Sequence, residues 1–144
     1  MIEKDTVRLL RECDLGVKMG VKSIEDVIDY VRSEELKGAL VECKRAHEDL
    51  DRQVTDMLND YHDEGKDPNM MVKSMSWLKT NVKLTMNTSD HTVADLITDG
   101  CNMGVKSLSK YLNQYAAAEE RAKDITKKLI SQEEKLSVQM RDYL

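Results

Sequence analysis

One five-residue segment occurs twice in this chain, and it constrains the fold more than any other feature. Residues 19–23 read Met-Gly-Val-Lys-Ser, and residues 103–107 repeat those letters 84 positions later. The correspondence extends outward, because Gly16 matches Gly100. After a two-residue slip, His47 in the first copy corresponds to Glu133 in the second. An internal repeat of this kind predicts one structural unit that is used twice.

The composition favours an all-α protein. The chain has 144 residues, of which 34% are charged, with one Pro and no Phe. So few aromatic residues and turn formers argue against β-sandwiches and barrels. A length of this order is sufficient for one domain with a sizeable core. We therefore expect residues 1–144 to form a single helical bundle.

Four long helices follow from the spacing of apolar residues and from the breaks between them. We expect the first to begin near Asp5 or Thr6 and to end near residue 32, and the second to begin after Ser33 and to end near residue 63. A tight turn at Ser33 makes these two an antiparallel hairpin (repeat one, 5–63). Repeat two, 89–143, is a second hairpin that starts after Thr88 or Ser89. The crossover between them, 64–88, contains an amphipathic pattern that predicts a short fifth helix over 69–86.

In this order of helices, two hairpins joined by a long crossover, the chain resembles the ferritin-like superfamily, including its small bacterial domains of unknown function. The resemblance covers nearly the whole chain and implies a four-helix bundle. A di-iron centre of that superfamily requires two glutamates and two Glu-x-x-His motifs that project inward. The expected fourth helix offers Glu133 and Glu134 but no histidine. The departure from the pattern argues against ferroxidase, oxygenase and peroxidase activity.

A polar pair is nevertheless expected inside the bundle. In a hairpin centred near residue 33, His47 lies level with Gly20, and Glu133 occupies the equivalent place in the second hairpin with Cys101 as its neighbour. One interpretation, which we favour, is a hydrogen-bonded core pair that fixes the register of the helices. The other is an atypical metal site for iron, manganese or zinc, formed by the pair together with Cys101 and Asp14.

Cys43 and His47 lie four residues apart on one helix face and supply half of a zinc site. Leu129 replaces the cysteine in the second repeat, so a symmetrical four-ligand site does not follow. We expect Cys43 and Cys101 to be small apolar core residues. The sequence shows no nucleophile constellation, phosphate loop or dinucleotide motif. No cofactor is therefore expected unless the metal interpretation holds.

Partners and location follow from charge and cysteine content. A net charge of -5 gives no basic footprint for nucleic acid. Three cysteines without a CxxC motif fit a reducing compartment, and the N-terminus lacks the pattern of a signal peptide. We predict a cytoplasmic bacterial bundle, without catalytic activity, that acts through binding or assembly; the alternative is a metal-binding or redox protein. A homodimer, or a protein partner on the helix at 69–86, fits this function, whereas a membrane is not expected.

Overall fold

Four long helices make up most of the described chain. The computed structural model describes residues 2–63, 65 and 89–144, so the helix predicted over 69–86 lies outside the described residues. The helices are α1 (Ile2–Val27), α2 (Glu34–Asp60), α4 (Asp90–Gln114) and α5 (Glu120–Met140). Short 3-10 turns, Ile28–Tyr30 and Arg141–Tyr143, follow α1 and α5. The prediction of an all-α bundle of four packed helices is confirmed.

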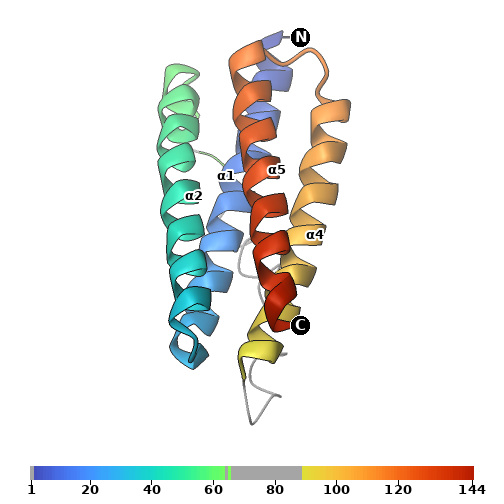
Figure 1. Cartoon of the computed structure of the whole chain (residues 1–144). Helices are drawn as coiled ribbons and strands as arrows, with labels where there is room; N and C mark the ends of the chain where they lie inside the picture. The colour runs from blue at the N-terminus through green and yellow to red at the C-terminus, as the bar shows by residue number, and fades with distance from the viewer. Residues whose placement is uncertain (1, 64, 66–88) are drawn as a thin grey trace.

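Each helix is antiparallel to both of its neighbours in the bundle. Helix α1 packs against α2 and α4, and α5 packs against the same two helices from the opposite corner. Helices α1 and α5 also touch across the diagonal. Helix α2 ends at one end of the bundle and α4 begins at the other, so these two helices run parallel (Figure 1). None of the described helices is long and apolar enough to cross a membrane.

Side-chain caps fix the helix starts that the sequence predicts. The hydroxyl oxygen of Ser33 accepts the N–H of Leu36, and that of Ser89 accepts the N–H of Thr92. Such a cap satisfies a backbone donor that has no partner within the helix. The first helix differs from the prediction, because α1 begins at Ile2 and not at residue 5 or 6. It also ends earlier, at Val27, where the chain tightens into a 3-10 turn.

Hydrogen bonds tie the two hairpins together at both ends of the bundle. The carboxylate of Asp90, at the start of α4, accepts the N–H groups of Arg32 at 2.8 Å and Ser33 at 3.0 Å. At the opposite end, the hydroxyl oxygen of Thr6 accepts the N–H of Glu119 at 2.8 Å. These bonds set the relative height of the hairpins, and therefore which residues lie level with one another.

Candidate functional site

A polar layer interrupts the hydrophobic core near the middle of the bundle. The core consists of two separate clusters. One cluster includes a buried residue from each helix on the side of the N-terminus, namely Val17, Leu50, Leu108 and Leu129. The other includes the corresponding residues seven positions along each helix, namely Ile24, Cys43, Cys101 and Leu136. Midway between them each helix contributes one residue: Gly20, His47, Gly104 and Glu133.

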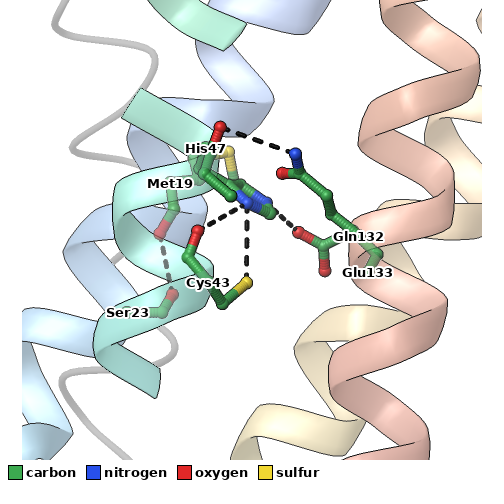
Figure 2. Close-up of polar contacts among 7 residues, drawn as sticks. Met19, Ser23, Cys43, His47, Gln132 and Glu133 are labelled. Atoms are coloured by element: carbon green, nitrogen blue, oxygen red, sulfur yellow. Dashed lines mark hydrogen bonds and ion pairs between the residues drawn. The ribbon is translucent and has the colours of Figure 1, made fainter. Parts of the chain in front are cut away.

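His47 and Glu133 form a buried ion pair in this layer. The His47 Nε2 atom lies 2.5 Å from Oε1 of Glu133, and their side chains are 2% and 13% exposed. The other ring nitrogen, Nδ1, lies 3.1 Å from the carbonyl oxygen of Cys43 and 3.5 Å from its Sγ atom. Figure 2 shows the imidazole between Cys43 on its own helix and Glu133 on α5. The predicted His47–Glu133 pair is confirmed.

The glycine inside each repeated five-residue segment, Gly20 or Gly104, leaves room for this pair. A Cβ atom added at Gly20 would lie 3.4 Å from Cδ2 of His47. At Gly104 an added Cβ would lie 3.4 Å from Cδ of Glu133. Both distances are at the short limit for a carbon contact. The repeated glycines therefore contact the polar pair directly, in the same layer as predicted.

The glycine that precedes each repeated segment, Gly16 or Gly100, has a different role, because it borders empty space. A Cβ atom at Gly100 would meet nothing within 4 Å, and one at Gly16 would meet only Leu108, at 3.9 Å. Both glycines line a cavity of about 300 Å³ between α1 and α4. His47, Glu133 and Cys101 line the same cavity. The polar layer thus faces an open volume, which the sequence did not predict.

Hydrogen bonding keeps the imidazole of His47 protonated despite its burial. Burial lowers the pKa of His47, but hydrogen bonds to Cys43 and Glu133, together with their charges, raise it to about 10. Burial and the neighbouring carboxylate of Glu133 raise the pKa of the Cys101 thiol. Cys101 and Glu133 also line the same cavity. At neutral pH the layer contains an imidazolium and a neutral Cys101 thiol.

Asp14 does not join the His47–Glu133 pair. Its Oδ2 atom lies 2.9 Å from Nζ of Lys18, and its carboxylate faces Asp51 on α2. Burial, together with a hydrogen bond to Asp14 and its charge, raises the pKa of Asp51 to about 7. Asp51 was not predicted, because it lies beside the apolar stripe of α2. Counting outward from the turn near residue 33 places His47 level with Gly20 and puts Asp51 within two residues of Asp14. This counting would have predicted the contact between Asp14 and Asp51.

A metal site needs several ligand side chains close together, and the described residues do not provide such a group. Among residues 2–63, 65 and 89–144, no three His, Cys, Asp or Glu side chains gather closely enough to hold a metal ion. Both ring nitrogens of His47 already have hydrogen-bond partners. The proposed ligand set of His47, Glu133, Asp14 and Cys101 is divided, because Asp14 pairs elsewhere. A metal role for these residues stays a prediction.

Comparison with known proteins adds no relative. A scan against models of protein families, a search of curated proteins and a search of solved structures each returned no match. The polar layer and the cavity beside it are therefore the features that bear on function.

Proposed function

We propose that this protein is a helical bundle of ferritin-like topology that binds a small, largely apolar molecule in the cavity between α1 and α4. The cavity itself is the observation that carries the proposal. Its volume is about 300 Å³. Pockets that bind small molecules begin at about this size. Helix order supports the ferritin-like topology, since α1–α2 and α4–α5 are hairpins and α2 runs parallel to α4.

The cost of placing glycines inside helices gives an energetic reason to regard the cavity as functional. A glycine inside a helix costs roughly 1 kcal/mol relative to alanine. At Gly20 and Gly104 that cost is offset by the space needed for the ion pair. At Gly16 and Gly100 no such contact offsets it, because an added Cβ would enter open space. What these two glycines preserve is the volume of the cavity.

The lining of the cavity indicates the kind of ligand. Most of its wall consists of aliphatic side chains and glycine backbone, and these contribute Leu15, Val17, Ile24, Leu96, Ile97 and Leu108. The ion pair His47–Glu133 lies at one place on that wall. An apolar wall with a few polar groups is the usual form of a small-molecule site. The ligand is therefore expected to have an apolar body and one group that hydrogen-bonds to the polar layer.

A titration with indole tests the proposal, since indole combines apolar rings with one N–H donor. Proton–nitrogen NMR spectra of the full chain report the backbone amides of the glycines. Indole should shift the amides of Gly16, Gly20, Gly100 and Gly104 with one saturable affinity, and Gly38, which does not line the cavity, should not move.

Two leucine variants provide the matched control. Both glycines are exposed, but Gly100 lines the cavity, so Gly100→Leu places a side chain at its mouth, whereas Gly38→Leu places one on α2 away from it. The first should abolish indole binding and the second should leave it unchanged. Shifts that do not saturate, or equal binding by both variants, would contradict the proposal.

A further inference from the structure

Three groups that line the cavity stand in the order of a thiol, an imidazolium and an orienting carboxylate. The Cys43 Sγ atom lies 3.5 Å from Nδ1 of His47, and Nε2 of His47 lies 2.5 Å from Oε1 of Glu133. Figure 2 shows the same series, with the imidazole between the thiol and the carboxylate. A cysteine beside a protonated histidine that a third group orients is an arrangement that activates a thiol as a nucleophile. All three residues line the cavity between α1 and α4.

We propose that Cys43 is a nucleophilic thiol, activated by His47 and Glu133, that reacts with an electrophilic carbon of small apolar molecules entering the cavity. This inference rests on the proposed ligand site, because the electrophile reaches Cys43 through it. It goes beyond simple binding, because the occupant would become covalently attached to the protein.

The hydrogen bonds of His47 hold the protonated form of the ring that this chemistry requires. Glu133 accepts a hydrogen bond from Nε2–H, and the protonated Nδ1 of the imidazolium faces the sulfur atom of Cys43. That Nδ1–H donates to the carbonyl oxygen of Cys43, 3.1 Å away, so the positive charge of the ring lies beside Sγ and stabilises its thiolate. Both ring nitrogens then have acceptors, so the structure stabilises an imidazolium beside a thiolate.

Cys43 differs from the other two cysteines in exposure and in partner. Cys43 is 9% exposed, against 0% for Cys13 and 2% for Cys101. The Cys13 thiol has the hydroxyl of Thr126 at 3.1 Å, and burial raises its pKa to about 12. Burial and Glu133 also raise the pKa of Cys101. Cys13 and Cys101 therefore serve as internal controls, because they are thiols of the same chain that are not activated.

The covalent step balances with groups that are present. With an activated ester, the Sγ thiolate attacks the carbonyl carbon, and the carbon–sulfur bond forms. The bond from that carbon to the leaving oxygen breaks, and the proton held by His47 goes to that oxygen. The products are an acylated Cys43 and a free alcohol. With iodoacetamide, a carbon–sulfur bond replaces the carbon–iodine bond, iodide leaves, and the proton stays on His47.

The groups that face His47 set the pH dependence of the reaction. They are Cys43 on its own helix and Glu133 on α5; Cys101 on α4 adjoins Glu133, and Glu12 on α1 lines the same cavity. Carboxylates favour the imidazolium and hence the thiolate–imidazolium pair. The rate of Cys43 alkylation should therefore depend only weakly on pH between 8 and 6.

Alkylation of the full chain with iodoacetamide tests the inference, with peptide mass spectrometry reporting each cysteine separately. Between pH 8 and pH 6 the rate at an unassisted thiol with a pKa near 8.5 falls roughly 80-fold. The rate at Cys43 should fall less than about threefold over the same range, and at pH 7 it should exceed the rates at Cys13 and Cys101 at least tenfold. A fall as steep as that of an unassisted thiol would overturn the inference, using the wild-type chain alone.

Variants identify the partners of the thiol. His47→Gln and Glu133→Gln should each slow Cys43 alkylation at pH 7 by about tenfold or more. Glu42→Gln, which neutralises an exposed carboxylate next to Cys43 in the sequence, should change it less than about twofold. Reactivity of Cys13 reports unfolding of a variant, in which case the wild-type pH profile decides. An unchanged rate in a folded His47→Gln chain would overturn the inference.

Indole separates this inference from the proposed function. Saturating indole should protect Cys43 from iodoacetamide. If indole binds but Cys43 reacts as an unassisted thiol, the inference fails alone. If Cys43 shows the flat pH profile but indole neither binds nor protects, the proposed function fails and the activated thiol remains.

Discussion

The free energy of unfolding should fall as the pH rises from 7 to 8.5, and His47→Gln should remove most of that fall. In the folded chain the pKa of His47 is raised to about 10, whereas an unfolded histidine titrates near 6.5. Between these values the folded state retains a proton that the unfolded state has lost. The stabilisation is complete below the unfolded pKa and is lost as the pH rises through the folded pKa.

The expected size follows from one retained proton. A difference of one bound proton changes the free energy of unfolding by about 1.4 kcal/mol per pH unit, so 1.5 units give about 2 kcal/mol. The pKa of Asp51 is raised to about 7, so Asp51 titrates at the lower end of this window, and unfolded cysteines titrate near its upper end. Both are present in wild type and variant. The ionisation of Cys43 is coupled to His47, so both chains carry Cys43→Ser, and the difference between their pH slopes then isolates His47.

Urea unfolding at pH 7.0, 7.5, 8.0 and 8.5 measures the two slopes. His47→Gln should also lower stability at pH 7 by about 3 kcal/mol, because it leaves Glu133 without its buried partner. The exposed His91 provides the control, since His91→Gln should keep the wild-type slope. Equal slopes for wild type and His47→Gln would refute the charged buried pair.

Three further predictions concern stability. Gly100→Ala and Gly38→Ala should each raise the free energy of unfolding by about 1 kcal/mol, because both added methyl groups enter open space. Gly104→Ala should gain less in the same urea assay, because its Cβ would press on Glu133; an equal gain would contradict the close contact. Asp51→Asn should be more stable than wild type at pH 8 and lose that advantage at pH 4 in thermal melts. The raised pKa of Asp51 stabilises the fold only below its unfolded pKa, and that stabilisation is lost as the pH rises through about 7; a variant less stable at pH 8 would contradict the buried carboxyl pair. Ser33→Ala should lower stability by about 1 kcal/mol through loss of the cap on Leu36, whereas Ala at the exposed Ser131 should have little effect.

The polar layer was predictable because each hairpin has a short, fixed turn. Ser33 caps α2 directly after α1 ends, so positions at equal depth in the first hairpin follow from counting outward from that turn. Counting places His47 level with Gly20, and an added Cβ at Gly20 would touch the imidazole. The internal repeat then transfers the result to Glu133. Local turn geometry and periodicity were sufficient for this part of the fold.

The cavity and the thiol series were not predictable in the same way. The space between α1 and α4 depends on the distance between two helices that no turn connects, and sequence periodicity carries no such information. The spacing of Cys43 and His47 shows only that both lie on one face of α2. That Nδ1 faces the sulfur while Nε2 faces Glu133 depends on side-chain rotamers and on the position of α5. The same spacing was therefore interpreted as half of a metal site.

The protonation state of His47 tests the central claim most directly, because pair, layer and thiol activation all depend on it. Proton–nitrogen NMR of the full chain with labelled histidine distinguishes an imidazolium from either neutral tautomer. The structure predicts that both ring nitrogens of His47 still carry protons at pH 8.5, with a midpoint near pH 10. A neutral ring at pH 8, with a midpoint near the ordinary value of about 6.5, would contradict it.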